Sequence, residues 1–463
     1  MVGVDKVKKN DIYEFEIIDC GMNFEGIAKN ENQVVFIPDT LKGEVVKTKI
    51  IKVNKSYAIG KVENIIKRSP YRCEPFCEVF KRCGGCSCQH IEYREQLNLK
   101  RNIVENVLNK QYVKYSKLNS TIGMGIPMYY RNKGQYPVRR NKEGVTKIGF
   151  YSKRSHEIVE NRTCYIENQR IDEVAKLVFE KLVLVGFKGY SDIDKKGDIR
   201  HIIIRRGTHT DEIMAIIVVN SKEAFKSDKF KIIAKDLSEI DKDIKSIYLN
   251  FNNSDTNEIL GNDEKLIFGQ KYIFDYIGKY KYAISPKSFF QVNTLQAEIL
   301  YETLKNGLKL KNTDILFDLY SGVGSIGIFL SDSVSKVYGI EIEKQAVEMA
   351  NINIKENNVT NCEYIAGSVE EKIVEFRNRK ISPDVIVVDP PRKGLDEKSI
   401  EYILGFLPKK IGYVSCNPAT FARDLKLLSE KYDVDIITPV DMFPNTQHVE
   451  CLAVLELKKN IEK

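Results

Sequence analysis

The chain has 463 residues, which is too long for one ordinary domain and predicts two or three. Hydrophobic residues make up 43% and charged residues 29%, a composition typical of a soluble protein with packed cores. No stretch approaches the roughly 20 uninterrupted apolar residues of a spanning helix, which argues against a transmembrane bundle. The net charge of +8 suits a polyanionic partner such as nucleic acid, although a lysine-rich protein without one has the same balance.

The N-terminus and the cysteine content bear on the cellular compartment. Met1 to Asn10 is charged and lacks an apolar run before a small-residue cleavage site, so we expect no signal peptide and no membrane association. We therefore expect a cytoplasmic protein. In a reducing cytosol, ten cysteines are expected to bind metal or to take part in catalysis rather than to form disulfides.

Residues 4–66 predict a small β-barrel. Alternating segments at Tyr13–Ile18, Val34–Ile37 and Val45–Val53 are separated by turn residues, and no helical period interrupts them. Lysines alternate with apolar positions along the last of these segments. They suit RNA contacts, but for this segment alone we favour a solvated strand face.

A group of cysteines follows the barrel. Cys83-Gly-Gly-Cys86 is a tight chelating pair, Cys77 lies upstream, and Cys164 is a candidate for a distant fourth ligand. Four thiolates suit either zinc or an iron–sulfur cluster, and the spacing leaves both open. One pair plus two single cysteines favours iron–sulfur, because zinc sites usually show two close pairs. Cys73 and Cys88 have no assigned role in this arrangement.

The segment from Glu92 to Leu118 predicts a helix, and a mixed α and β region follows from about 121 to 284. This middle region is basic and carries aromatic residues, a combination that suits single-stranded or splayed RNA. Many of these aromatic residues are also candidates for the core. The residues concerned are Arg131, Lys133, Arg139, Arg140, Lys142, Lys147, Lys153 and Arg154, with Tyr129, Tyr130, Tyr136, Phe150 and Tyr151 among them.

From about residue 285 the pattern changes to strands that alternate with helices. This pattern predicts a doubly wound parallel sheet with helices on both faces. The expected strands are Ile315–Leu319, Lys336–Glu341, Glu363–Ala366, Asp384–Val388, Ile411–Ser415, Val434–Ile437 and Cys451–Leu457.

A glycine-rich turn follows the first of these strands and predicts a nucleotide-like cofactor. Gly322, Gly324 and Gly327 lead from the strand into a helix, and glycine lets the backbone approach a ligand closely. Glu341 ends the next strand about 20 residues later, where a carboxylate can accept hydrogen bonds from ribose hydroxyls. At this point NAD and S-adenosylmethionine both remain open.

The fourth strand favours S-adenosylmethionine. It ends in Asp389-Pro-Pro, at the sheet edge where ligands of open α/β folds bind. Proline has no backbone N–H and restricts its neighbour, which gives a stiff wall for a planar base. This motif is typical of methyltransferases that act on bases, although a simple strand stop also explains it in isolation.

Cys416 ends the next strand at the same edge and is the predicted nucleophile. It precedes a helix that starts near Pro418, and a helix N-terminus favours thiolate. C5 of uracil is a poor nucleophile, and addition of a thiolate at C6 activates it. A base must then remove the C5 proton. Glu450 is the preferred base, and His448, two residues away, is the competitor.

Taken together, these motifs are similar to those of the class I RNA 5-methyluridine methyltransferases, specifically the iron–sulfur branch acting on 23S ribosomal RNA. The resemblance covers nearly the whole chain. It implies that the helix at 92–118 packs on the catalytic domain, and we expect a monomer. The implied domains are an RNA-binding, OB-like TRAM barrel at 4–66, a central domain from 67–91 and 121–284, and a Rossmann-like methyltransferase domain from 92–120 and 285–463.

The resemblance also assigns roles residue by residue. Cys416 matches the family's nucleophile and Glu450 its proton-abstracting carboxylate. The family has no ligand at Cys73, which leaves open which upstream cysteine binds. The remaining matches are the [4Fe–4S] ligands Cys77, Cys83, Cys86 and Cys164, and the S-adenosylmethionine contacts Gln291, Tyr320, Glu341 and Asp389.

Three alternatives remain. A transfer RNA uracil-C5 methyltransferase has the same chemistry, but that branch generally resembles this family without the cysteine group. An adenine N6-methyltransferase prefers an aromatic residue after Asp-Pro-Pro, where this chain has Arg392, and has no use for Cys416. A non-catalytic RNA-binding assembly factor would not need the intact set of predicted site residues.

Overall fold

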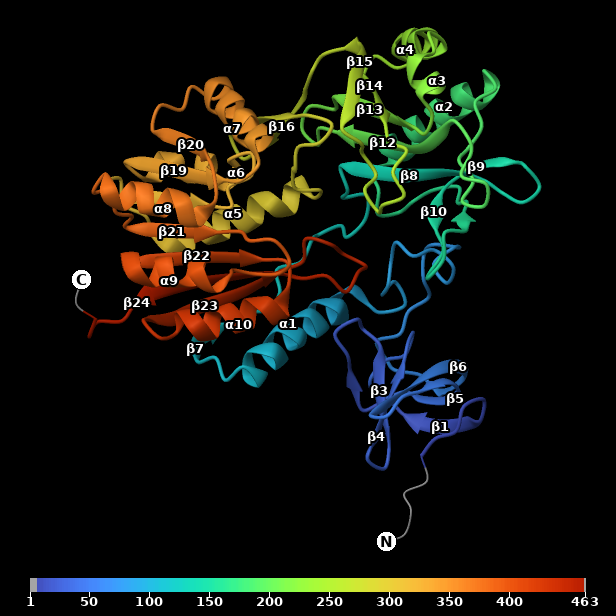
Figure 1. Ribbon diagram of the computed structural model, residues 1–463. Coiled ribbons are helices and arrows are strands. Elements are labelled where there is room, and N and C mark those ends of the chain that lie inside the picture. Colours follow the sequence, from blue (N-terminus) through green and yellow to red (C-terminus); the bar gives the residue numbers. More distant parts are fainter. Residues whose placement is uncertain (1–5, 462–463) are drawn as a thin grey trace.

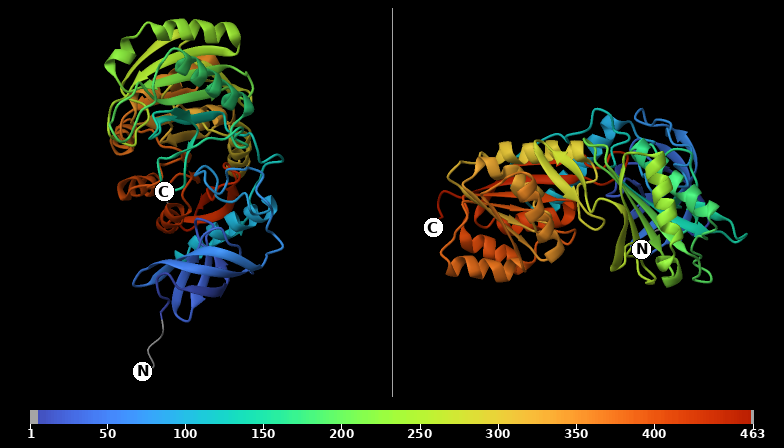
Figure 2. Two further views of the ribbon diagram at one scale, coloured as in Figure 1. Left: turned by 90° about the vertical axis from the view of Figure 1, so that its right-hand side faces the viewer. Right: turned by 90° about the horizontal axis from the view of Figure 1, so that it is seen from above.

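A computed structural model describes residues 6–461 as three packed bodies (Figure 1). A small barrel and a central α/β body lie one above the other beside a larger mixed sheet with helices on both faces (Figures 1 and 2). Within the described part of the chain, the search for a helix long and apolar enough to cross a bilayer finds none.

The N-terminal strands form the predicted barrel. They pair in the order β1-β5-β6-β4-β3-β2, and the backbone N–H of Ile18 donates to Ile27 O to bring the first strand against the third. Phe15, Val35 and Val46 alternate with exposed neighbours and fill the interior. The strands are β1 (Ile12–Glu16), β2 (Asp19–Cys20), β3 (Gly26–Asn30), β4 (Gln33–Ile37), β5 (Val45–Val53) and β6 (Tyr57–Lys67).

Helix α1 (Tyr93–Lys110) is shorter than the helix predicted over 92–118. Tyr112 adopts a left-handed conformation with φ 57°, which ends the helix. The chain then forms strand β7 (Tyr115–Leu118), which joins the edge of the mixed sheet parallel to β23 (Tyr432–Val440). The prediction of a helix to residue 118 is therefore wrong, because strand pairing with a distant segment determines these residues.

The central body contains a sheet in the order β15-β14-β13-β12-β8-β9. Its strand β13 is a continuous, fully buried apolar run because both faces of the sheet are covered there. Helices α2 and α4 pack on one face of this sheet. The hairpin of β16 and β17 packs against the other face. The elements are β8 (Lys133–Arg140), β9 (Thr146–Ile148), β10 (Phe150–Tyr151), β11 (Ile158–Val159), α2 (Gln169–Leu184), β12 (Ile199–Arg206), β13 (Ile213–Val219), α3 (Lys222–Lys226), α4 (Lys229–Ile240), β14 (Ile244–Phe251), β15 (Asp263–Gly269), and the hairpin of β16 (Ile273–Ile277) and β17 (Tyr280–Ile284).

The C-terminal region forms the predicted Rossmann-like fold. Alternate residues of each inner strand face opposite sides: Leu316 packs under α5, and Phe317 packs under α8. The elements are α5 (Thr294–Leu308), β18 (Ile315–Leu319), α6 (Ser325–Leu330), η1 (Ser331–Ser333), β19 (Lys336–Glu341), α7 (Lys344–Glu356), β20 (Cys362–Ala366), α8 (Val369–Asn378), β21 (Val385–Val388), α9 (Glu397–Phe406), β22 (Lys410–Ser415), α10 (Pro418–Leu428), β23 and β24 (Glu450–Leu457).

This sheet is mixed rather than wholly parallel. Its order is β20-β19-β18-β21-β22-β24-β23-β7, and β24 runs antiparallel to both of its neighbours. The prediction of a parallel sheet therefore fails at β24. The reversal arises because β23 and β24 follow one another without a helical crossover, and such a connection pairs strands antiparallel. As a result, the first residue of β24 lies at the same sheet edge as the last residue of β22.

Candidate active site

The glycine-rich turn after β18 leaves open space for a ligand. Tyr320, Gly322 and Gly324 all have positive φ, which turns the chain sharply from the strand into α6. The Gly322 N–H donates to Glu341 Oε2 at 2.9 Å, so this carboxylate lies beside the turn as predicted. A Cβ atom placed on Gly322 would meet nothing within 4 Å. The backbone here is therefore open to a bound molecule, while the carboxylate retains further lone pairs for hydroxyl groups.

Buried polar groups surround the same turn. Ser321 is buried and its Oγ has no hydrogen-bond partner. Burial raises the pKa of Asp389 to about 7, and burial also raises the pKa of Asp318 to about 8, although the Gly327 N–H opposes this shift. Unsatisfied buried polar atoms are costly, so this arrangement fits a polar ligand that supplies the missing partners. An S-adenosylmethionine molecule, with its ribose hydroxyls and charged amino-acid end, meets that requirement.

Gln291 lies between α5 and the central body. The Asn132 side chain donates to Gln291 O at 2.8 Å, and the Asn132 N–H donates to Val292 O at 2.8 Å. The Gln291 side chain lies close enough to the Tyr301 hydroxyl to oppose the rise in its pKa that burial causes, and Tyr301 bonds Ser325 at the start of α6 at 2.9 Å. This chain of contacts links the predicted Gln291 position to the glycine-rich turn.

Tyr320 connects the turn to α9. Its hydroxyl bonds Ser399 Oγ at 2.9 Å, and burial raises its pKa to about 12. The tyrosine is held by this bond at the mouth of the turn, with its ring against the hydrophobic core beneath the α8 side of the sheet.

Cys416 lies at the end of β22, as predicted, and lines a cavity of about 160 Å³. Asn417 caps α10 by accepting from the Ala419 N–H at 3.1 Å, and its side chain donates to Arg392 O at 2.9 Å. The expected thiolate character is not what the structure favours. Burial, followed by the charges of Glu450 and Asp389, raises the pKa of Cys416, and Arg392 opposes the shift.

Glu450 and His448 both lie close to Cys416. Ser415 pairs with Cys451 across β22 and β24, which makes Cys416 and Glu450 neighbours at the sheet edge. Glu450 is buried, and burial followed by the charge of Asp389 raises its pKa well above the ordinary value. His448 lines the cavity of Cys416, and burial lowers its pKa. The geometry thus brings together both candidate bases and the predicted nucleophile.

The loop over 441–449 is anchored by residues that the sequence interpretation did not select. Lys100 of α1 is fully buried and donates to Asp441 Oδ1 at 2.5 Å, and the Tyr93 hydroxyl donates to Asp441 Oδ2 at 2.9 Å. Lys100 lies on the same helical face as the apolar residues Ile103 and Val107. A lysine on a buried face signals a buried ionic partner, and that signal was available in the sequence.

Comparison with known proteins identifies the family. The family model described as tRNA (Uracil-5-)-methyltransferase matches residues 255–459, and the TRAM domain model matches residues 6–62. An uncharacterized RNA methyltransferase of Clostridium acetobutylicum is 45% identical over 98% of this chain and 99% of its own length.

The chain belongs to the S-adenosylmethionine-dependent RNA uracil-5-methyltransferase family.

Further relatives agree with this assignment. Uncharacterized RNA methyltransferases of Oceanobacillus iheyensis and Staphylococcus aureus are 41% and 40% identical, each over 98% of this chain and at least 98% of their own lengths. The crystal structure of Pyrococcus abyssi tRNA (uracil-54, C5)-methyltransferase in complex with S-adenosyl-L-homocysteine superimposes with a TM-score of 0.74 at 26% identity, over 96% of this chain and 99% of that one. The protein is therefore an RNA methyltransferase that uses S-adenosylmethionine, with a TRAM domain at its N-terminus.

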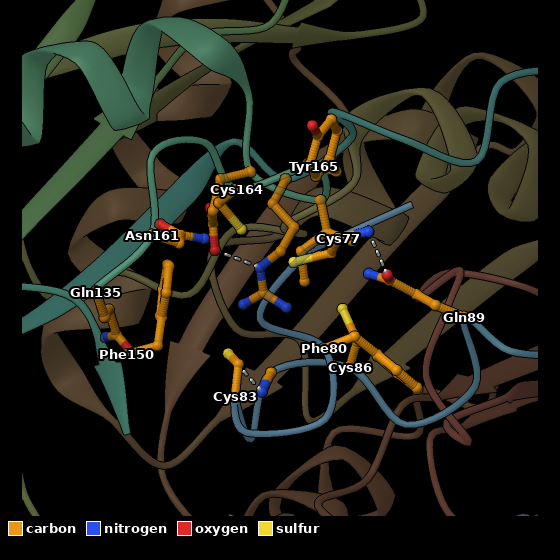
Figure 3. Close-up of a pocket in the computed structure, with 14 residues that line it drawn as sticks. Cys77, Phe80, Cys83, Cys86, Gln89, Gln135, Phe150, Asn161, Cys164 and Tyr165 are labelled. Atoms are coloured by element: carbon orange, nitrogen blue, oxygen red, sulfur yellow. Dashed lines mark hydrogen bonds and ion pairs between the residues drawn. The ribbon is translucent and has the colours of Figure 1, made fainter. Parts of the chain in front are cut away.

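The four predicted cluster cysteines of this uracil-5-methyltransferase line one cavity of about 180 Å³ (Figure 3). Their sulfur atoms face a common space in the close-up. Burial is the main reason that all four thiols have raised pKa values, to about 12 for Cys86. Within residues 6–461, the search for three or more His, Cys, Asp or Glu residues arranged to hold a metal ion finds no such group. The four residues are Cys77, Cys83, Cys86 and Cys164.

The two cysteines without a predicted role lie elsewhere. Cys73 donates to Gln89 O at 3.3 Å and does not line the cavity. Cys88 is fully buried in a small hydrophobic cluster with Phe24 and Ile103. The four predicted ligands thus line one cavity, and Cys73 and Cys88 lie outside it. The spacing of the cysteines in the sequence did not distinguish these two groups.

The basic residues of the middle region are largely engaged within the protein. Arg131 pairs with buried Glu167 at 3.1 Å, and Arg140 pairs with Asp194 at 2.7 Å. Tyr130 is among the core residues. The interpretation of the whole set as an RNA-binding surface is therefore too broad, because several of these charges are neutralised by nearby carboxylates.

Proposed function

We propose that this methyltransferase modifies C5 of a uridine in 23S ribosomal RNA through a temporary bond between Cys416 and C6 of the base. The observation that carries the proposal is the antiparallel pairing of β24 with β22, which makes Cys416 and Glu450 neighbours. Asp389 ends the adjacent strand and influences both of them electrostatically. Nucleophile and base are thus held on rigid strands at one edge of the sheet.

In the proposed mechanism, Cys416 Sγ bonds to C6, and the electrons of the C5–C6 double bond move toward the C4 carbonyl. S-adenosylmethionine supplies the methyl group that C5 then accepts. Glu450 removes the C5 proton, the double bond re-forms, and the thiolate leaves. The raised pKa of Glu450 makes its carboxylate a stronger base, and the carboxyl must lose its own proton before it can act; His448 is the alternative base.

The proposed cofactor site consists of Gln291, Tyr320, Glu341 and Asp389. Glu341 would hold the ribose hydroxyls beside the open Gly322 backbone, and Asp389 would contact the same cofactor from the adjacent strand end. The buried, unpartnered Ser321 Oγ supports a polar ligand in this turn.

The proposed metal group is a [4Fe–4S] cluster on Cys77, Cys83, Cys86 and Cys164. Support comes from the four thiols lining one cavity, since four thiolates are the usual ligand set of such a cluster. The cluster is proposed to be structural, because methyl transfer needs no electron transfer.

Each of the three bodies has its own proposed role. Residues 4–66 bind RNA, residues 67–91 with 121–284 hold the cluster and further RNA, and residues 92–120 with 285–463 carry out the chemistry. We place the reaction in the cytoplasm, with the protein acting as a monomer. The cysteine group favours 23S ribosomal RNA, whereas the superimposable P. abyssi enzyme acts on uracil-54 of tRNA, which makes tRNA the second candidate substrate.

Mass mapping of RNA tests the proposal. Ribosomal and transfer RNA are compared between cells with and without the gene. We expect one or more 5-methyluridines to disappear from 23S ribosomal RNA and to return when the gene is restored. Loss confined to transfer RNA would establish the second candidate instead, and no change in either RNA would contradict both.

A further inference from the structure

Two cavities of the molecule meet near the predicted nucleophile. The cavity of Cys416 adjoins a larger groove, of about 940 Å³, between the barrel and the central body. Asn23 and Gln447 line both of them, so these two residues lie at the boundary between the two cavities. Side chains able to stack on bases or contact phosphates line the groove. They are Phe36, Tyr57, Phe150, Tyr151, Lys153 and Arg154.

Gln447 is held in one orientation by Ser87. The Ser87 hydroxyl donates to Gln447 Oε1 at 2.6 Å and accepts from the Gln447 backbone N–H at 3.0 Å. The N–H groups of Ser87 and Cys88 also donate to Asn445 O, at 3.1 and 3.3 Å. Because the amide oxygen faces Ser87, the Nε2 group of Gln447 is directed away from that contact, and the residue lines both cavities.

This arrangement joins two regions far apart in the sequence. Ser87 directly follows the proposed cluster ligand Cys86, whereas Gln447 precedes the proposed base Glu450 by three residues. The Tyr130 hydroxyl adds a further bond to the same loop, donating to Pro444 O at 3.0 Å. The cysteine-bearing segment therefore fixes the position of the loop at the boundary between the cavities.

We propose that Gln447 is a specificity-determining residue that contacts the nucleotide next to the target uridine, and that Ser87 is its positioning residue. This inference rests on the proposed function. A base that reacts with Cys416 must leave its stack and enter the small cavity, while its neighbour stays in the groove. Gln447 at the boundary then donates Nε2–H to an acceptor atom on that neighbouring base. Contacts to flanking nucleotides are a general source of sequence preference in enzymes that extrude a base.

The test uses the full-length protein with its metal content intact and short single-stranded RNAs that contain the mapped uridine. Every nucleotide is placed in turn on each side of it. For Gln447→Ala we expect KM for the preferred RNA to rise about fivefold to tenfold, as for loss of one hydrogen bond, with kcat nearly unchanged. Preference at one flanking position should fall by the same factor. Gln447→Glu removes the donor and should have at least as large an effect.

Ser87 provides the second arm of the test. Ser87→Ala should weaken the same preference by a smaller factor, because Gln447 remains but is no longer fixed, and Ser87→Thr, which keeps the hydroxyl, should restore it. Gln270→Ala is the matched control, since Gln270 is exposed at a distant turn of the central body. Melting temperature and iron content show whether each variant is folded as the parent is.

Two results would overturn the inference. If Gln447→Ala lowers kcat and leaves the flanking preference intact, Gln447 acts only through the loop that carries Glu450, and the base contact is refuted. Unchanged KM and unchanged preference would refute it as well. Failure of the proposed function is distinguished from failure of this inference by the parent protein. If the proposed function is wrong, the protein without any substitution methylates none of these RNAs.

Discussion

The thiol of Cys416 and the four thiols of the cysteine cavity are the same functional group in two different settings. Cys416 stands at a strand end beside two carboxylates, in a cavity that adjoins the wide groove through Gln447. The other four thiols line one cavity and face a common space. Both sets have raised pKa values through burial. The difference between them therefore lies in the neighbouring groups and not in thiol acidity, and the two proposed roles, bond formation at one site and metal binding at the other, depend on those groups.

Loss of the Cys416 thiol is the strongest test of this contrast. Cys416→Ala should lower methyl transfer by about 10⁴-fold or more, because no other group at the site forms the bond to C6. Binding of S-adenosylmethionine, measured by calorimetry, and the melting temperature should stay close to those of the parent. Methyl transfer that persists in this variant would refute the covalent mechanism.

Replacement of Glu450 separates bond formation from release. Glu450→Gln should lower turnover by roughly 10²- to 10⁴-fold, as for loss of a general base, and should trap a protein–RNA adduct that survives denaturation. The adduct forms because Cys416 and methyl transfer are unaffected, whereas the C5 proton stays in place. Denaturing gel electrophoresis with labelled RNA detects it. His448→Ala is the comparison: an adduct trapped there, and not in Glu450→Gln, would transfer the role of base to His448.

Substitution of a cysteine that lines the cavity of Cys86 should lower the stability of the protein more than it affects the methyl-transfer step. Cys86→Ser should remove bound iron and lower the melting temperature by on the order of 10 °C, because a ligand that binds the folded state stabilises it. Cys73→Ser is the matched control, since Cys73 lies outside the cavity, and it should retain both iron and stability. Equal loss of iron in the two variants would contradict the proposed ligand set.

The smallest expected effect concerns the protonation of Cys416. Burial raises its pKa, so the reactive thiolate is scarce at neutral pH, and the single-turnover rate should rise about tenfold per pH unit without levelling near neutrality. Arg392 favours the thiolate, so Arg392→Gln should slow the reaction a few-fold and move the profile to higher pH. Lys393→Gln removes a neighbouring charge and is the control. A rate that is independent of pH from neutral upward would show that the thiol ionises easily.

Several features of the fold and site could be read from the sequence because they depend on local pattern. The alternation of Val45–Val53, the apolar run at Ile315–Leu319 and the proline-marked start of α10 all appear as predicted. The glycine-rich turn and Asp389-Pro-Pro follow strands, and parallel strands bring their ends to one edge.

Other features were decided by contacts between distant segments. Tyr115–Leu118 became a strand because β23 offered an unpaired edge, although the residues continue an amphipathic pattern. Arg131 and Arg140 belong to the basic set that suits RNA, but each forms an ion pair within the protein, with Glu167 and Asp194 respectively. No local pattern reveals such partners, because strand pairing and buried ion pairs depend on which segments meet in space.

The sequence by itself determined the residue types of the site: a thiol after one strand, carboxylates after others, and glycines where the backbone must bend. The tertiary structure decided which of these groups meet. Cys416 and Glu450 are neighbours because β24 runs antiparallel to β22, and a parallel strand would have carried Glu450 to the opposite edge of the sheet. The physical reason is that strand direction is set by the connection and by pairing across the sheet, neither of which the side chains of one strand encode.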